Sequence, residues 1–266
     1  MKARSRNSAS RLVVAASQVA KRTPRPLRRL LAQLRYVGMP EPLRSVRPYS
    51  LLSNLNLLYL QELAIRLDRA GVKGDIVECG VYRGGSAGVL AYAAGRSPES
   101  RRLWLFDSFR GMPKASKHDD TYSHSITGAF VGSIGDTRCL VERNGLAPDR
   151  YEVVVGWFQD TFATANVEVV ALLHVDCDFY DPVRLSLETF YPRLSEGGFV
   201  VLNDYGSFSG CRKATDGFLQ QHFDDTTRPN LVQIDGDAYY FCKPGASHQA
   251  SGRSGESQVT TDLQTE

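Results

Sequence analysis

Acidic and amide side chains follow two apolar segments of the chain, and their oxygen atoms could bind a cation. Asp176 comes after the apolar segment 169–175, and Asn203 and Asp204 follow the segment 198–202. Like charges at neighbouring positions are costly unless a cation neutralises them, and hard cations such as Mg²⁺ prefer oxygen donors. Ligands of open α/β sheets bind at the carboxyl ends of the strands. These three residues are therefore predicted to form a metal site, and the alternative is a set of solvated caps on loops.

A glycine-rich turn is the second place where chemistry is expected. Gly80, Gly84 and Gly85 join an apolar segment to a helix that begins near Ser86. Glycines let a ligand approach the backbone, and a helix N-terminus offers free N–H groups. The spacing GxxxGG differs from the GxGxxG of dinucleotide enzymes, and the acid Glu78 suits an ammonium or sulfonium ligand better than a pyrophosphate. On this motif alone, a purely structural turn remains an alternative.

Asp107 ends the next apolar segment, about 20 residues after the glycines, where Rossmann-type folds bind ribose hydroxyls. The alternative is that Asp107 caps a local turn with Ser108. Together with the glycine-rich turn, Asp107 favours a nucleoside-containing ligand.

Elements of alternating type must position these residues. The expected helices cover 51–70, 86–94, 126–145, 181–194 and 212–223, and the expected strands cover 75–79, 103–106, 151–155, 169–175 and 198–202. Asp235–Asp237 has the composition of a hairpin turn between segments 231–234 and 238–242. This order predicts an α/β fold whose mostly parallel sheet has helices on both faces and a C-terminal antiparallel hairpin.

Charge is distributed unevenly along the chain. Residues 1–50 hold twelve Lys or Arg and one acid, and the remaining residues carry a net charge of −8. An acidic body argues against nucleic acid as a partner, because phosphate binding needs a concentrated basic face. Five scattered cysteines without CxxC spacing indicate free thiols and a cytoplasmic location. The Arg- and Ser-rich start leaves an organelle transit peptide as an alternative.

The chain of 266 residues, 42% hydrophobic, is long enough for one sizeable domain. We expect a basic N-terminal arm at 1–45, a catalytic domain at 46–245 and a disordered tail at 246–266. Leucines at helical spacing in 26–36 predict an amphipathic helix in the arm. This helix either packs on its own domain or makes a peripheral contact with a membrane or partner.

Several stretches resemble the macrocin O-methyltransferase family, metal-dependent O-methyltransferases that act on sugars in antibiotic biosynthesis. The matching stretches are 75–86, 103–113, 155–161, 173–180 and 191–210. The resemblance implies a Rossmann-like class I methyltransferase fold with a seven-stranded sheet. It also implies S-adenosylmethionine and Mg²⁺ as cofactors, a small-molecule glycoside as acceptor and a homo-oligomer.

The resemblance also implies roles for individual residues. The expected cofactor-binding residues are Glu78, Gly80, Ser86, Asp107, Ser108, Ser133 and Trp157. Of these, Glu78, Gly80 and Ser86 match the methionine end, Asp107 matches the ribose ligand, and Ser133 and Trp157 lie in stretches that border the adenine. The expected metal ligands are Asp176, Asn203 and Asp204. The family usually has Asp-Asp where this chain has Asn203-Asp204, so one negative charge is missing from the expected metal site.

Methyl transfer to an alcohol needs help with deprotonation, which a metal chelated by vicinal acceptor oxygens supplies. We expect Asp176 to accept the proton, with His124 as the second candidate if it is more than an ordinary loop histidine. His174 is expected to be a core histidine. The segment 44–53 is predicted to fold over the acceptor, with Tyr49 in the pocket wall.

The acceptor is expected to be a sugar hydroxyl in a glycosylated natural product or glycolipid. The alternatives are a phenol- or catechol-type methyltransferase, a non-catalytic scaffold that retains the fold, and a nicotinamide-dependent Rossmann enzyme. The glycine spacing and Glu78 disfavour the nicotinamide-dependent enzyme.

Overall fold

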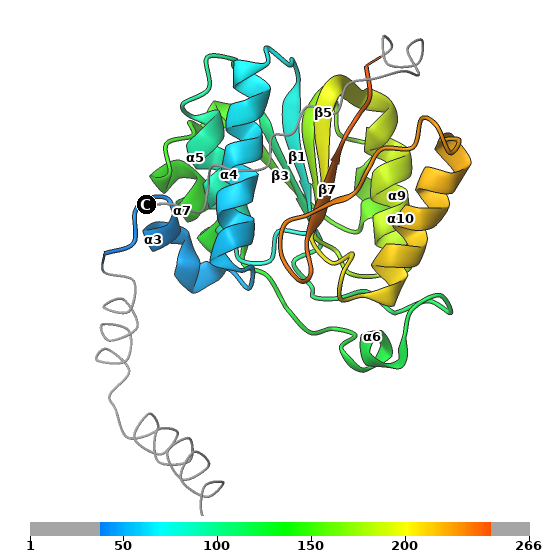
Figure 1. Ribbon diagram of the computed structural model, residues 1–266. Coiled ribbons are helices and arrows are strands. Elements are labelled where there is room, and N and C mark those ends of the chain that lie inside the picture. Colours follow the sequence, from blue (N-terminus) through cyan, green and yellow to red (C-terminus); the bar gives the residue numbers. More distant parts are fainter. Residues whose placement is uncertain (1–37, 246–266) are drawn as a thin grey trace, which may run out of the picture.

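The computed structural model describes residues 38–245 and shows a single twisted sheet between two layers of helices (Figure 1). The sheet has seven strands in the order β3-β2-β1-β4-β5-β7-β6. The strands are β1 (Asp75–Cys79), β2 (Leu103–Asp107), β3 (Tyr151–Val155), β4 (Val170–Val175), β5 (Leu194–Leu202), β6 (Val232–Gln233) and β7 (Tyr239–Cys242). The pairs among β1 to β5 are parallel, whereas β7 runs antiparallel to β5 and β6 antiparallel to β7. The α/β fold expected from the sequence is confirmed, including the antiparallel hairpin.

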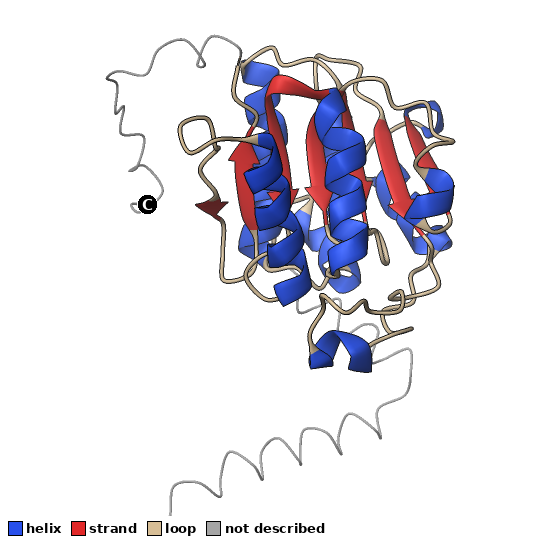
Figure 2. Cartoon of the chain, turned by 90° about the vertical axis from the view of Figure 1, so that its right-hand side faces the viewer, coloured by secondary structure: helices blue, strands red, loops and turns tan. Residues whose placement is uncertain are grey.

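Helices cover both faces of the sheet (Figures 1 and 2). The helices are α3 (Leu43–Val46), α4 (Asn54–Arg69), α5 (Gly85–Ala94), α6 (Thr121–Ser125), α7 (Ile134–Arg143), α8 (Phe158–Thr161), α9 (Tyr180–Phe190) and α10 (Ser209–His222). Short 3₁₀ helices cover Arg47–Tyr49, Pro148–Arg150 and Tyr191–Arg193. One core packs α3, α4, α5 and α7 against the sheet, and the second core packs α8, α9 and α10 against the opposite face.

The central strands are buried from both sides. All six residues of β4 are buried, as are four of the five residues of β1. Parallel strands covered on both faces read as continuous apolar runs, as the sequence of β4 does. In α4, Leu60, Leu63 and Leu67 have no exposed surface and recur at helical spacing, so one side of this helix packs on the sheet. The two cores therefore hold the strand tips in fixed positions.

The segment between β2 and α7 differs from the prediction. The expected helix 126–145 begins only at Ile134, because Gly128 and Phe130 adopt positive φ angles of 77° and 56° that interrupt a helix. A short helix that was not predicted, α6, lies before this loop, and Asp120 caps it by accepting a hydrogen bond from the Ser123 N–H at 2.8 Å. α6 lies beyond the carboxyl edge of the sheet, apart from both helical layers (Figures 1 and 2).

The expected helix 181–194 also ends early, at Phe190. Pro192 lies in the 3₁₀ turn that follows and has no N–H to continue the helix. β5 then begins at Leu194, four residues before the expected start at Gly198.

Two predictions fall on residues outside the described range, the amphipathic helix at 26–36 and the disordered tail at 246–266. Across residues 38–245, none of the helices is long and apolar enough to cross a lipid bilayer.

Candidate functional site

A cavity of about 1070 Å³ opens at the carboxyl edge of the parallel strands. Most of the predicted site residues line it: Gly80, Ser86, Asp107, Ser108, Trp157, Asp176, Asn203 and Asp204. Its wall does not include Glu78, Ser133 or His124. The topology explains the convergence, because adjacent parallel strands β2, β1, β4 and β5 end at the same edge.

Gly80 brings the tips of β1 and β4 into contact. It has a φ of 94°, and a Cβ atom on it would meet the backbone oxygen of Asp176 at 1.7 Å. The Gly80 N–H donates to the backbone oxygen of Phe106 in β2 at 2.9 Å. Only glycine fits this position, since the conformation and the close approach both exclude a side chain. The glycine-rich turn therefore lies directly beside the acidic end of β4.

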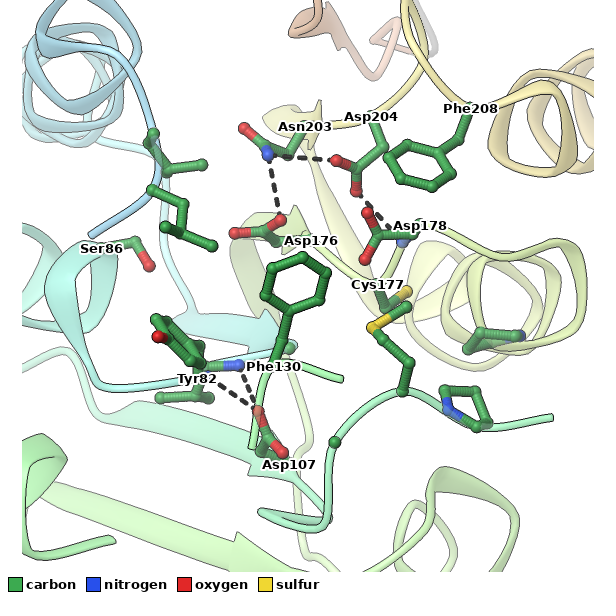
Figure 3. A pocket seen from close by; sticks show the side chains of 18 of the residues that line it. Tyr82, Ser86, Asp107, Phe130, Asp176, Cys177, Asp178, Asn203, Asp204 and Phe208 are labelled. Carbon is green, nitrogen blue, oxygen red and sulfur yellow. Dashed lines mark hydrogen bonds between the residues drawn. The ribbon is translucent and has the colours of Figure 1, made fainter. Parts of the chain in front are cut away.

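Asp107 holds the same turn from the side of β2. Its Oδ2 accepts the N–H groups of Val81 at 2.7 Å and Tyr82 at 2.8 Å (Figure 3). Its Oδ1 accepts the N–H of Phe109 at 2.6 Å. Oδ2 therefore uses both of its lone pairs, whereas Oδ1 keeps one for a further donor. Asp107 thus fixes the backbone and also presents an acceptor to the cavity, which fits a ligand with hydroxyl groups.

Glu78 lies behind this wall, buried within the sheet. Its Oε1 is 2.9 Å from Nδ1 of His174, and neither side chain has exposed surface. In the described part of the chain, Glu78 Oε2 and His174 Nε2 have no hydrogen-bond partner. No sequence motif indicated this hydrogen-bonded pair, although the adjacent parallel strands place Glu78 directly opposite His174. The complete burial of His174 confirms that it is a core histidine, as expected from the sequence.

The carboxylates of Asp176, Asp178 and Asp204 lie close together at the ends of β4 and β5 (Figure 3). The Asn203 Nδ2 group donates to Asp176 Oδ1 at 2.9 Å and to Asp204 Oδ1 at 3.2 Å, and the Asp178 N–H donates to Asp204 Oδ2 at 3.1 Å (Figure 3). Among residues 38–245, the only groups that donate to these Asp176 and Asp204 oxygens are that amide and that N–H. The predicted metal ligands are thus together.

Burial and mutual repulsion shift the pKa values of these carboxylates. Burial, followed by the charges of Asp204 and Glu78, raises the pKa of Asp176 well above its usual value. Burial also raises the pKa of Asp204 to about 6. No Lys or Arg in the described range forms a salt bridge with the cluster. A bound divalent cation would relieve this repulsion.

The donor set fits a hard cation, with an amide in place of one acid. Within the described ranges no group of three or more His, Cys, Asp or Glu side chains is arranged to hold a metal. The carboxylates of Asp176 and Asp204 and the amide oxygen of Asn203 would supply three oxygen donors, which is the ligand type of Mg²⁺. The buried Asn56 also contacts this group: its Nδ2 donates to Asn203 Oδ1. No sequence motif marked Asn56.

The outer wall of the cavity combines the segment before α4 with aromatic side chains. Residues Arg47–Ser53 line it, with the guanidinium of Arg83 4.9 Å from the ring centre of Tyr49. The rings of Phe130 and Phe208 lie around the cavity beside the carboxylates (Figure 3). Tyr122 and Leu51 are 60% and 66% exposed and complete an apolar rim. This rim is suited to the apolar parts of a ligand.

Ser133 and His124 lie farther from the chemistry. The Ser133 Oγ caps α7 by accepting the Asp136 N–H at 3.2 Å, and the Ser133 N–H donates to the Tyr82 oxygen at 2.9 Å. His124 is an exposed residue of α6. Both roles expected from the resemblance therefore stay predictions.

Comparisons with known proteins agree with this geometry. The profile of the family "Macrocin-O-methyltransferase (TylF)" matches residues 1–243. A tetracenomycin-C rhamnosyl 4'-O-methyltransferase of Streptomyces olivaceus is 33% identical over 198 residues, which are 72% of this chain and 73% of that protein. The mycinamicin III 3''-O-methyltransferase of Micromonospora griseorubida is also 33% identical over 198 residues, covering 70% of this chain and 74% of the relative.

Solved structures show the same fold. The O-methyltransferase NovP superposes with a TM-score of 0.67 at 25% identity, over 74% of this chain and 83% of NovP. The calicheamicin methyltransferase CalS11 superposes with a TM-score of 0.60 at 20% identity, over 90% of this chain and 94% of CalS11. With the family match spanning the whole described domain up to residue 243, the expected family and activity class are confirmed. The chain belongs to the macrocin O-methyltransferase family and is an S-adenosylmethionine-dependent O-methyltransferase.

Proposed function

We propose that this enzyme methylates a hydroxyl of a sugar on a glycosylated natural product, with Mg²⁺ bound beside the acceptor. The observation that carries the proposal is the contact of Gly80 with the backbone of Asp176, which places the glycine-rich turn against the acidic cluster. Both curated relatives act on glycosylated compounds, a rhamnosyl-tetracenomycin and mycinamicin III. A methyl donor over the turn and a sugar over the cluster would then be neighbours.

The cofactor half of the cavity has groups for each part of S-adenosylmethionine. This cofactor supplies an electrophilic methyl group on a sulfonium. Asp107 accepts one ribose hydroxyl through the free lone pair of Oδ1, with Ser108 beside it, and Trp157 contributes an apolar surface for the adenine. Ser86 lies at the N-terminal turn of α5, where backbone N–H groups favour a carboxylate. Glu78 acts from behind the wall, and its contact with the cofactor stays a prediction.

Asp176, Asn203 and Asp204 would hold the metal. When bound, Mg²⁺ lowers the pKa of a coordinated hydroxyl and fixes its orientation. Asp176 faces the cavity and accepts the hydroxyl proton. Its Oδ1 accepts only the Asn203 amide among the described residues, so the carboxylate keeps acceptor capacity on the cavity side.

Turnover of two variants tests the base. We expect Asp176→Asn to lower kcat by at least about a hundredfold, in the range typical of a lost general base. His124→Ala is expected to remain close to the wild type, since His124 is exposed outside the cavity wall. Both reactions are run at saturating Mg²⁺ with product detected by mass spectrometry. Wild-type turnover of Asp176→Asn, or a large loss only in His124→Ala, would reverse the assignment.

A panel of acceptors tests the substrate class. Rhamnosylated polyketides, free rhamnosides and catechols are compared at equal concentrations. We expect methylated product from the glycosides, and preferential methylation of the catechol would establish the alternative. Absence of product from every glycoside would overturn the proposed substrate class. A cytoplasmic location, a homo-oligomer and membrane contact through the basic arm stay predictions.

A further inference from the structure

The side-chain amides of Asn56 and Asn203 are hydrogen-bonded beside the expected metal site. Asn56 is the third residue of α4, and only 2% of its surface is exposed. Its Nδ2 donates to Asn203 Oδ1, and Asn203 Nδ2 in turn donates to Asp176 and Asp204. Asn203 therefore directs its NH₂ group toward the carboxylates and its oxygen toward α4.

In this orientation the Asn203 amide donates hydrogen bonds to the carboxylates, but it does not present its oxygen to a metal between them. An amide coordinates a cation through its oxygen, and the NH₂ group carries only donors. The oxygen of Asn203 faces the carboxylates only after the amide has made half a turn about its Cβ–Cγ bond. The NH₂ group would then face Asn56, whose present partner atom is also an NH₂ group. Asn203 can turn favourably only if Asn56 turns as well.

The turn of Asn56 would give a hydrogen bond to a buried acceptor that now has none. Asn56 Oδ1 is buried and has no hydrogen-bond partner among the described residues. A buried amide oxygen without a donor is costly, because it has lost its bonds to water and gained none in the protein. If Asn56 turns, this oxygen accepts the NH₂ group of Asn203.

We propose that Asn56 is a positioning residue for the metal ligand Asn203, and that the two amides turn together when a divalent cation binds. The proposal rests on the metal site of the proposed function. The hydrogen bond between the amides reverses its direction, and the cation replaces the two bonds from Asn203 to the carboxylates. Asn56 thereby allows the amide of Asn203 to present its oxygen to the cation.

The same residue connects the metal site to the outer wall of the cavity. The Asn56 N–H donates to Ser53 Oγ at 3.0 Å, and the Ser53 hydroxyl donates to Asp235 Oδ2 at 2.6 Å. Ser53 ends the wall segment Arg47–Ser53. The residue whose side chain reaches Asn203 thus also binds the end of the cavity wall through its backbone N–H.

Binding of Mn²⁺, followed by electron paramagnetic resonance, tests the role of Asn56. We expect Asn56→Ala to weaken Mn²⁺ binding about tenfold, as removal of a residue behind a metal ligand typically does. Asn54→Ala is the matched control, because Asn54 lies in the same helical turn but is exposed. Equal affinities of Asn56→Ala and the control would overturn the proposal.

A double-mutant cycle separates positioning from a general packing defect. In Asn203→Asp the ligand is a carboxylate, which presents an oxygen to the metal in either orientation. Asn56→Ala should therefore cost little Mn²⁺ affinity in this background and about tenfold in the wild type. The same loss in both backgrounds would show that Asn56 acts only through packing, which contradicts the proposal.

A second variant covers the case in which Asn56→Ala unfolds. Asn56→Asp keeps the acceptor oxygen, removes the donor and is compatible with the first turn of a helix. It should bind Mn²⁺ at least as tightly as Asn54→Asp, which adds the same charge at the exposed position. Weaker binding than this control would overturn the proposal.

The turning of the amides has a direct signature in ¹⁵N NMR spectra. The side-chain NH₂ signals of Asn56 and Asn203, assigned from the variants, should shift on Mg²⁺ addition, while that of Asn54 stays in place. Saturating Mg²⁺ without a shift of either signal would overturn the proposal. Failure of the wild type to bind Mn²⁺ or Mg²⁺ would instead overturn the metal site itself, together with this inference.

Discussion

Glu78 Oε1 and His174 Nδ1 lie 2.9 Å apart in the interior of the sheet, where neither side chain reaches solvent. A carboxylate only accepts hydrogen bonds, so the imidazole N–H donates. The pair joins β1 to β4 directly behind the cavity wall. It therefore supports the strand tips on which the cofactor and the metal depend.

His174→Ala is expected to lower the free energy of unfolding by about 3 kcal/mol. The reason is that the variant leaves Glu78 buried without its partner. Urea denaturation measures the change, with His222→Ala as control because His222 is exposed. The double variant Glu78→Leu/His174→Leu should recover part of the loss. A cost below that of the control would mean that the pair contributes nothing to stability.

Gly80→Ala is expected to destabilise the fold and to abolish cofactor binding. Its Cβ atom would lie 1.7 Å from the Asp176 backbone oxygen at a φ of 94°, so the strand tips must separate. Gly135→Ala in α7 is the matched control, since a Cβ atom there meets nothing within 4 Å. The control should gain up to about 1 kcal/mol of stability. Thermal unfolding and calorimetric titration with S-adenosylmethionine compare them, and tight binding by Gly80→Ala would contradict the expectation.

Asp107→Asn should weaken the binding of S-adenosylmethionine by at least about tenfold, because hydrogen bonds to a charged group contribute about 1.5–3 kcal/mol. An amide offers one oxygen, whereas both oxygens of Asp107 accept backbone N–H groups. Calorimetric titration checks the change, and Asp149→Asn serves as the exposed control. An unchanged dissociation constant would remove Asp107 from the cofactor site.

Mg²⁺ binding is expected to weaken by about tenfold between pH 7.5 and pH 5, because protons compete for a carboxyl whose pKa is near 6. In the metal-free protein this pKa is raised above the ordinary Asp value of 3.8. The folded state thus binds more protons in this window, and acidification from pH 6 toward 4 favours the fold at this site. Metal loss in this range should therefore occur without unfolding. At both pH values, calorimetric titration measures the affinity for Mg²⁺, and circular dichroism shows whether the protein stays folded.

Chelation of divalent cations is expected to stop methyl transfer without releasing the cofactor. EDTA should abolish turnover, and added Mg²⁺ should restore it, while binding of S-adenosylmethionine stays near its original affinity. The reason is that Asp107, at the end of β2, and Ser86, in α5, lie on other elements than the carboxylate cluster. Full activity in EDTA would exclude a role for the metal.

The sequence predicts the sheet and most of the cavity wall because the strands are apolar and end in polar residues. Asp107 and Asp176 could be placed at strand ends from this pattern, and adjacent parallel strands then bring them to one edge. Helix boundaries near Gly128 and Pro192 were predicted less well, since backbone conformation there overrides the side-chain pattern. The contact of Asn56 with Asn203 had no local signal. Asn56 and Asn203 are 147 residues apart in the sequence and meet only because α4 packs on the sheet.

The bond between Ser53 and Asp235 has a consequence for how the protein is made. These residues are 182 positions apart, and Asp235 belongs to the turn between β6 and β7. During synthesis, the wall segment Arg47–Ser53 leaves the ribosome long before its anchor exists. The catalytic pocket is therefore completed only after the final hairpin has been translated, so a nascent or truncated chain that lacks this hairpin holds an open, unfinished acceptor side.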